Sequence, residues 1–253
     1  MANYTIKPIK VGSILYYRGA FSSNQDHYKE KEDFPVLIFL IEGKGKKILV
    51  DTGCGDPDTE SMKVSFHGPS TRSPEEEPGR ALAALGVKCA EIDTVIMTHL
   101  HWDHCYNNHL FPQADFYVQR SEMLGAVDPL PRFMITYEAF ATGVVPPWAR
   151  QDTRWKYIDG DYELMEGIKL IHIPGHTLGL QGVVVDTEKG PHLLASDAVP
   201  LYDNCPGDDF VISGLCLDMA KYYESIQKMK SYHATVIPSH DDKVLENKVY
   251  PVL

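Results

Sequence analysis

Three histidines and one aspartate lie within six residues of this chain, at His99, His101, Asp103 and His104. Neutral imidazole and carboxylate are the side chains that bind zinc and its first-row neighbours. The alternating spacing lets His99 and His101 point to one side while Asp103 and His104 turn elsewhere, which suits two adjacent metals better than one. Without a metal, imidazoles this dense would repel one another when protonated and would lose solvation when buried.

Three further candidates come later in the chain, and each directly follows an apolar run typical of a buried strand. They are His176 in a Pro-Gly turn, Asp197 and His240. The first cluster likewise follows such a run, Val95 to Met97. A sheet delivers the side chains that follow its strands to one edge. We therefore expect these residues to meet the first cluster.

The order of these residues resembles the metallo-β-lactamase superfamily, and Asp51-Thr52-Gly53 is similar to that superfamily's early Asp-Thr-Gly turn. The resemblance runs from about Val36 to His240. It implies an α/β fold, a four-layer αββα sandwich of two mixed β-sheets with helices outside. We expect residues 1–253 to form a single domain of this kind.

The resemblance also implies a centre with two divalent metal ions. One ion is expected on His99, His101 and His176, the other on Asp103, His104 and His240, with Asp197 bridging them. Zinc is the expected metal, and iron, manganese or cobalt also suit such ligands. Two such ions acidify a shared water, whose hydroxide attacks a carbonyl or phosphoryl centre. Asp103 would take the proton and pass it to the leaving group, and Asp51 would orient a ligand histidine.

Within the superfamily, the chain is similar to the N-acyl homoserine lactonases, which predicts opening of a lactone ring and quorum quenching. The similarity rests on one domain, a polar segment from Arg18 to Asp33 and the ending Ser239-His240-Asp241. Those lactonases hydrogen-bond the substrate carbonyl with a tyrosine three residues after the bridging aspartate, where this chain has Pro200. Tyr202 is the candidate replacement, although a shifted loop would aim it at solvent.

Two other functions remain open for the same cluster. A metallohydrolase could act on another ester, a thiolester or a phosphodiester instead of a lactone. A metal-binding protein of this fold could also have lost catalysis and serve as a sensor. The complete set of seven candidate ligands favours an enzyme over the sensor.

Composition disfavours some partners. The net charge of −11, from 24 Lys and Arg against 35 Asp and Glu, disfavours nucleic acid, which binds largely through cationic side chains. No apolar run approaches the roughly 20 residues of a membrane span, and no signal-peptide pattern begins the chain. The five cysteines include no Cys-x-x-Cys pair, so we expect a cytoplasmic protein without disulfides. The expected partner is a small-molecule substrate, and a homodimer stays open.

Periodicity predicts the elements that position the cluster. Residues 128–155 fit no clean period, so this segment is expected to be an insertion that forms a lid, a partner surface or a plain cover for the core. Residues 18–33 and 56–78 are expected to be loops. Strands are expected at 6–17, 36–42, 47–50, 95–97, 115–119, 180–186 and 191–196, and helices at 78–86 and 219–229, the latter capped by Asp218.

Overall fold

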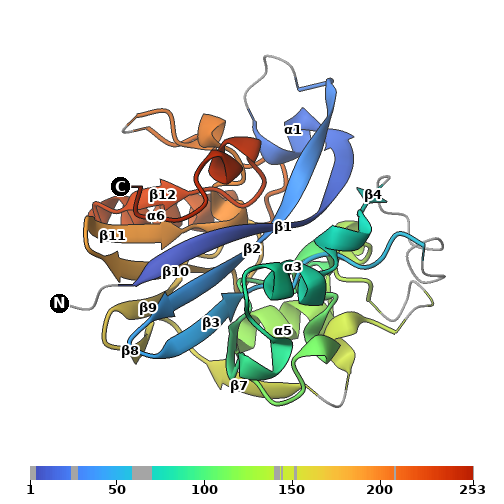
Figure 1. Cartoon of the computed structure of the whole chain (residues 1–253). Coiled ribbons are helices and arrows are strands. Elements are labelled where there is room, and N and C mark those ends of the chain that lie inside the picture. The colour runs from blue at the N-terminus through green and yellow to red at the C-terminus, as the bar shows by residue number, and fades with distance from the viewer. Residues whose placement is uncertain are drawn as a thin grey trace.

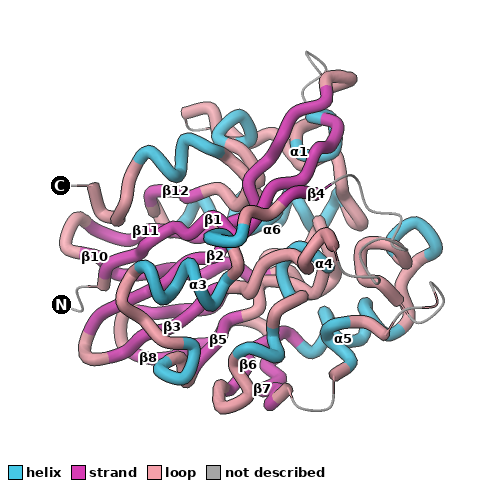
Figure 2. Tube along the Cα trace, turned by 45° about the vertical axis from the view of Figure 1, so that its right-hand side comes forward, coloured by secondary structure: helices cyan, strands magenta, loops and turns pink. Residues whose placement is uncertain are grey.

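The structure is a computed structural model that describes residues 4–23, 28–58, 70–139, 143, 145–150, 153–207 and 209–252. Two β-sheets pack face to face, and helices lie on their outer sides (Figure 1). Loops and short helices gather on one side of the strands, around α4 and α5 (Figure 2). No helix of these ranges is long and apolar enough to cross a membrane.

The first sheet has the strand order β4-β1-β2-β3-β5-β6-β7. Strands β1, β2 and β3 pair antiparallel, whereas β3, β5, β6 and β7 pair parallel, so the sheet is mixed. Its strands are β1 (Thr5–Tyr17), β2 (Lys31–Gly43), β3 (Lys46–Val50), β4 (Ser70–Thr71), β5 (Thr94–Ile96), β6 (Asp115–Gln119) and β7 (Arg154–Ile158).

The second sheet has the order β12-β11-β10-β9-β8. Its strands are β8 (Tyr162–Met165), β9 (Ile168–His172), β10 (Gln181–Thr187), β11 (Gly190–Leu194) and β12 (Thr235–Ile237). Strand β11 pairs parallel with β12 and antiparallel with β10, which in turn pairs antiparallel with β9. Strands β9, β11 and β12 therefore run in the same direction, and their carboxyl ends lie at one edge of the sheet.

Five α-helices and several 3₁₀ turns complete the described part of the chain. The α-helices are α1 (Arg18–Phe21), α3 (Pro78–Ala84), α4 (Trp102–Cys105), α5 (Arg120–Val127) and α6 (Met219–Ser231). The 3₁₀ turns are η1 (Pro74–Glu76), η2 (Cys89–Glu91), η3 (Asn108–Leu110), η4 (Pro131–Phe133), η6 (Pro147–Ala149), η7 (Ser196–Ala198), η8 (Tyr202–Asn204) and η9 (Asp242–Glu246). Asp218 caps α6 as predicted, because its carboxylate accepts a hydrogen bond of 3.0 Å from Lys221 N.

Apolar side chains on both faces of the strands produce the layers. Successive side chains of a strand point to opposite faces, so a continuous apolar run is buried only if both faces are covered. In β2, Val36, Ile38 and Leu40 pack in the core on the helix side, with Leu82 of α3. The residues between them pack against the second sheet. A third core lies between the second sheet and α6. The predicted four-layer αββα sandwich is confirmed.

The predicted start of the second long strand is wrong. Strand β2 begins at Lys31 rather than Val36, and β1 and β2 remain paired as far as Tyr17 opposite Lys31. This end of the ribbon projects from the body of the molecule, next to α1 (Figure 1). Its first residues are polar because there is no core on either side of them, so their composition suggests a loop. Of the predicted 56–78 loop, residues 59–69 lie outside the described residues.

Candidate metal centre

The structure brings all seven predicted residues to one edge of the sandwich, where each follows a strand. His99 and His101 lie in the loop after β5, Asp103 and His104 on α4, His176 after β9, Asp197 in η7 after β11, and His240 after β12. All seven side chains are buried. Their nitrogen and oxygen atoms form three groups, each within 4.8 Å: His99, His101 and His176; Asp103, His104 and His240; and His99, His104 and Asp197.

Asp197 lies between the first two groups and turns one oxygen toward each. Its Oδ2 is 3.4 Å from His176 Nε2 and 4.0 Å from His99 Nε2. Its Oδ1 is 3.4 Å from His104 Nε2 and 3.2 Å from His240 Nε2. A carboxylate placed in this way can bind a separate ion with each oxygen.

Three of the histidines are oriented by contacts on the far side of the ring. An imidazole that donates its Nδ1–H to an acceptor keeps its Nε2 lone pair for a metal. These contacts run from His104 Nδ1 to Asp51 Oδ2 (2.7 Å), from His176 Nδ1 to Leu215 O (2.8 Å) and from His240 Nδ1 to Pro35 O (2.9 Å). The three Nε2 atoms are thereby directed toward the centre of the cluster.

The distances fit metal ions better than a hydrogen-bonded core. His99 Nε2 is buried and has no hydrogen-bond partner among the described residues. His176 Nε2 and His101 Nδ1 are 3.1 Å apart. Two nitrogens bound tetrahedrally to one zinc ion, each at its usual bond length, would be about 3.3 Å apart. The two adjacent groups can therefore hold two metal ions, one on each side of Asp197.

Electrostatics keep His99 and Asp197 in the forms that bind cations and favour the protonated form of His104. Burial and the neighbouring rings hold the pKa of His99 well below its ordinary value, so this imidazole is neutral. Burial opposes the charge on Asp197, yet His240 and His104 hold the pKa of that carboxyl well below its usual range. For His104, burial is outweighed by the carboxylates of Asp103 and Asp197, and its pKa is raised. A divalent cation would replace that proton.

Asp51 supports the cluster from β3. Its carboxylate accepts hydrogen bonds from Thr98 N (2.8 Å) and Thr98 Oγ1 (2.7 Å), besides the contact with His104. Its backbone has a φ of +61°, a conformation that costs a non-glycine residue free energy. These contacts agree with the interpretation that Asp51 orients a histidine. Cys105, in contrast, packs in the core on the helix side and belongs to none of the three groups.

The turn that carries His176 depends on a glycine. Gly175 has a φ of +143°, and a Cβ there would stand 2.5 Å from the backbone of Tyr222 in α6. Leu217 N and Asp218 N both donate to Gly175 O, at 2.7 and 3.0 Å. The segment that begins α6 is therefore tied directly to the turn that carries His176.

Glu122 of α5 is a supporting residue that sequence reasoning missed. It is fully buried, and its carboxylate accepts four hydrogen bonds: from Leu100 N (2.9 Å), Tyr137 Oη (3.0 Å), Thr177 Oγ1 (2.6 Å) and Gly179 N (3.0 Å). Leu100 lies between His99 and His101, and Thr177 follows His176. The carboxylate therefore joins the loops that carry three of the histidines. No motif marks Glu122, because its partners come from distant segments.

We expect Glu122→Gln to lower the free energy of unfolding by about 2 to 3 kcal/mol, because the amide nitrogen would face a donor and leave it unsatisfied. Denaturant unfolding of the metal-free protein measures this loss. Glu224→Gln is the control: Glu224 lies exposed on α6 and pairs with Lys221, so its replacement should change stability by less than about 0.5 kcal/mol. Equal stabilities for the two variants would contradict the joining role of Glu122.

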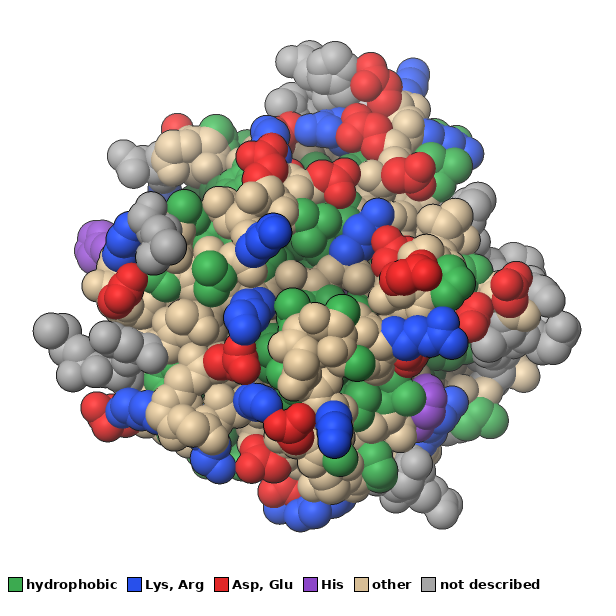
Figure 3. All heavy atoms as spheres, in the orientation of Figure 1, with side chains coloured by type: hydrophobic (Ala, Val, Ile, Leu, Met, Phe, Trp, Pro, Cys, Tyr) green, Lys and Arg blue, Asp and Glu red, His purple; other side chains and the backbone are tan. Residues whose placement is uncertain are grey.

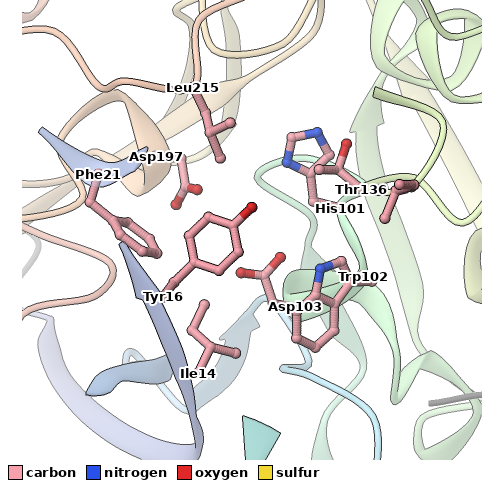
Figure 4. A pocket seen from close by; sticks show the side chains of 10 residues that line it. Ile14, Tyr16, Phe21, His101, Trp102, Asp103, Thr136, Asp197 and Leu215 are labelled. Carbon is pink, nitrogen blue, oxygen red and sulfur yellow. The ribbon is translucent and has the colours of Figure 1, made fainter. Parts of the chain in front are cut away.

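A cavity opens onto the cluster and is walled mainly by apolar side chains (Figure 4). Its described lining residues are Ile14, Tyr16, Phe21, His101, Trp102, Asp103, Ile135, Thr136, Asp197 and Leu215. Tyr16 and Phe21 both line this cavity, and Tyr17, the next residue of β1, is not among its described lining residues.

Part of the predicted 128–155 insertion packs on His101. The ring of Tyr137 meets the His101 ring edge-on at 4.7 Å, and the Phe133 ring lies parallel to it at 6.5 Å. Trp102 N donates to Thr136 O at 2.9 Å. Residues 140–142, 144 and 151–152 lie outside the described residues. A lid or partner role for this insertion stays a prediction.

The structure does not bring Tyr202 to the cluster. Tyr202 packs at the core between the two sheets and lines a separate surface groove with Cys205 and Phe210. Burial and the neighbouring Tyr250 raise the pKa of its phenol. It is not among the described residues of the cavity that Asp103 lines.

The backbone around Leu201 explains this placement. Leu201 is extended, with φ −127° and ψ 156°, so neighbouring side chains point in opposite directions. The Leu201 side chain packs in the core on the helix side, and Tyr202 therefore turns toward the inter-sheet core. Pro200 O accepts a hydrogen bond of 2.9 Å from His240 N, and Asp241 Oδ2 accepts one of 2.9 Å from Tyr202 N.

Comparison with curated proteins finds N-acyl homoserine lactonases. One from a Bacillus species is 32% identical over 174 residues, which is 66% of this chain and 64% of that protein. The aligned part is thus just under two thirds of that relative's own length. Another, from Bacillus cereus, is 28% identical over 206 residues, 78% of this chain and 76% of that protein.

Among solved structures, an AiiA variant from Bacillus thuringiensis with N-decanoyl-L-homoserine bound at its active site superposes with a TM-score of 0.81. Its identity is 23%, and the match covers 100% of this chain and 99% of that one. A sequence model described as the metallo-beta-lactamase superfamily matches residues 32–240, the part of the chain that holds both His/Asp groups and all the strands that present them. The chain therefore belongs to the metallo-beta-lactamase superfamily.

Proposed function

We propose that this protein is a metal-dependent hydrolase that opens the ring of a lactone bearing an acyl chain, such as an N-acyl homoserine lactone. The superfamily fold and the two adjacent buried His/Asp groups support a metallohydrolase. The lactone is supported by relatives at 28% and 32% identity that are N-acyl homoserine lactonases, and by the walls of the cavity.

The apolar and acidic side chains that line the cavity are the main support for this choice of substrate. Its apolar side, formed by Ile14, Phe21, Trp102, Ile135 and Leu215, meets a polar side with two carboxylates. No Lys or Arg is among its described lining residues. Phosphodiesters are anions that proteins commonly hold with such cations. A neutral ester with an apolar chain suits these walls better.

The roles of the chain's own residues follow from their positions. When bound, two divalent ions would acidify a water and polarise the ester carbonyl. Asp103 is 8% exposed, lines the cavity, and has its Oδ2 3.8 Å from His104 Nε2 and 3.7 Å from His240 Nε2. It can take a proton from the attacking water and give it to the alkoxide that leaves when the ring C–O bond breaks.

The other residues of the site would either hold the metal ions or shape the cavity. His99, His101 and His176 would hold one ion, His104, Asp103 and His240 the other, and Asp197 both. The apolar walls would bind the acyl chain and exclude water from it, so that chain length affects KM. The segment around Ile135 and Thr136 lines the cavity, which supports a covering role for the 128–155 insertion.

A hydrolysis screen of the metal-loaded protein tests the proposal. We expect release of one acid equivalent from N-acyl homoserine lactones, detected with a pH indicator, at a kcat/KM above those for thiolesters and phosphodiesters. Protein stripped by a chelator is the control and should regain activity when zinc is restored. Faster cleavage of a thiolester or phosphodiester would show that the proposed lactonase function is wrong and that the protein acts on that compound. Two bound metals with no turnover on any of these compounds would favour a non-catalytic metal-binding protein.

A further inference from the structure

We propose that the phenol of Tyr16, on β1, donates the hydrogen bond to the substrate's ring carbonyl oxygen. This inference rests on the lactone hydrolysis proposed above. It assigns the donor to a strand far in sequence from Asp197, rather than to the segment that follows it.

The first observation is the direction of the Tyr16 side chain. Tyr16 lines the cavity together with His101, Asp103 and Asp197. Its hydroxyl points into the cavity, toward the space bounded by these three side chains (Figure 4). Within residues 4–23, 28–58, 70–139, 143, 145–150, 153–207 and 209–252, no group donates a hydrogen bond to this hydroxyl or accepts one from it. The phenol can therefore serve a ligand.

The second observation is how the ring is held. The Tyr16 and Phe21 rings meet nearly perpendicular, at 82° and 6.3 Å between centroids. Phe21 in turn lies 5.1 Å from the His240 ring and 4.3 Å from Phe34. Aromatic rings prefer such edge-to-face and tilted contacts. Through Phe21, the position of the phenol is tied to a histidine of the candidate metal centre.

The third observation concerns the segment after Asp197, which offers no equivalent donor. Pro200 has no N–H and no side-chain donor. Tyr202 packs at the inter-sheet core, away from the cavity, for the reasons given above. The rest of the cavity wall supplies Thr136 and Trp102 as side-chain donors, and both stand on the far side of His101 and Asp103 from Asp197 (Figure 4).

The reaction needs a hydrogen-bond donor at the carbonyl oxygen, and this donor does not transfer its proton. As the water oxygen bonds to the ring carbonyl carbon, the C=O π electrons move onto the carbonyl oxygen. Tyr16 Oη–H donates to that oxygen and keeps its proton. When the carbonyl re-forms, the ring C–O bond breaks and its electron pair leaves on the alkoxide, which takes the proton held by Asp103. A preorganised donor that meets the developing charge lowers the barrier.

Tyr16→Phe tests the proposal, because phenylalanine keeps the ring and removes only the hydroxyl. We expect kcat/KM on an N-acyl homoserine lactone to fall about 100-fold, with metal content and circular dichroism unchanged. Tyr17→Phe is the matched control. Tyr17 is the next residue of the strand, is 50% exposed, and its ring lies under Lys31 Nζ at 4.8 Å. Its replacement should leave the rate unchanged.

A second readout does not depend on turnover. The corresponding γ-lactam, labelled with carbon-13 at the ring carbonyl, is a hydrolysis-resistant probe whose infrared stretching frequency falls when the oxygen accepts a hydrogen bond. We expect the bound probe to absorb at a higher frequency in Tyr16→Phe than in wild type or Tyr17→Phe. An unchanged frequency would overturn the proposal, even if the rate fell, because Tyr16 would then only shape the wall.

The failures of the two proposals are distinguishable. If wild type opens lactones and Tyr16→Phe opens them equally fast, the role of Tyr16 is wrong and the lactonase stands. The same holds if Tyr202→Phe, and not Tyr16→Phe, lowers the rate. If wild type opens no lactone but cleaves another ester, the lactonase proposal is wrong, and the assignment of Tyr16 to a lactone carbonyl is overturned with it.

Discussion

Asp103→Asn should lower kcat by about 10² to 10⁴, the range that general acid–base catalysis contributes. An amide cannot take a proton from water near neutral pH, whereas it nearly preserves the volume of the carboxylate. Asp103 lines the cavity and lies next to His104 and His240. Among the described lining residues, Asp197 is the other carboxylate. Asp197 is the poorer candidate, because its two oxygens face different groups and each would be bound to an ion.

The measurement is kcat on the best substrate of the hydrolysis screen, at fixed metal content per chain. Metal analysis of each sample separates loss of the proton acceptor from loss of an ion. Asp93→Asn is a matched control, because Asp93 is exposed at the opposite end of β5 and pairs with Lys46. A metal-replete Asp103→Asn protein with near wild-type turnover would rule out the proton-transfer role.

Wild-type protein reconstituted with zinc should hold two ions per chain, and His176→Ala and His240→Ala should each hold one. The two histidines belong to different groups on either side of Asp197. Removing the outer partner of a metal-bound histidine already costs about 10- to 100-fold in affinity, and removing the histidine itself should cost more. Both variants should also lose nearly all activity, because the proposed chemistry needs both ions.

Elemental analysis after removal of free metal gives the stoichiometry. His109→Ala is the control, because His109 is exposed and outside the three groups. It should retain two ions. A single ion in reconstituted wild type, or loss of both ions in each variant at saturating zinc, would contradict two separate sites.

Charged side chains of both signs are exposed on the surface (Figure 3). Lys and Arg are interspersed with Asp and Glu over the face shown in Figure 3, without a broad basic area there. This mixture agrees with the composition of the chain, 24 Lys and Arg against 35 Asp and Glu.

The sequence by itself determined the candidate metal-binding residues, and its resemblance to the superfamily implied the layers. Imidazole and carboxylate are the side chains that bind such metals, so the candidates could be recognised by residue type. Because the His-x-His-x-Asp-His motif follows a buried strand, its four ligands must lie together at the end of that strand. Local patterns are compatible with those layers: the continuous apolar run of β2 needs cover on both faces, and the stripe of Tyr222, Ile226 and Met229 needs a sheet beneath α6.

Apart from Asp51, only the tertiary structure decided which residues support that cluster. Glu122 looks like an ordinary helix glutamate until three other segments aim donors at it. The polar start of β2 pairs with β1 beyond the core, where burial no longer selects apolar residues.

The contrast between Tyr202 and Tyr16 has the same cause. Sequence distance from Asp197 favours Tyr202, but one extended residue, Leu201, turns that side chain to the inter-sheet core. Tyr16 is 181 positions before Asp197, yet the long β1 strand carries it to the cavity that Asp197 lines. The spacing of a motif predicts which side chains lie together only when they belong to the same short segment. The direction of a side chain across a cavity depends on long-range strand pairing and packing, which no local pattern records.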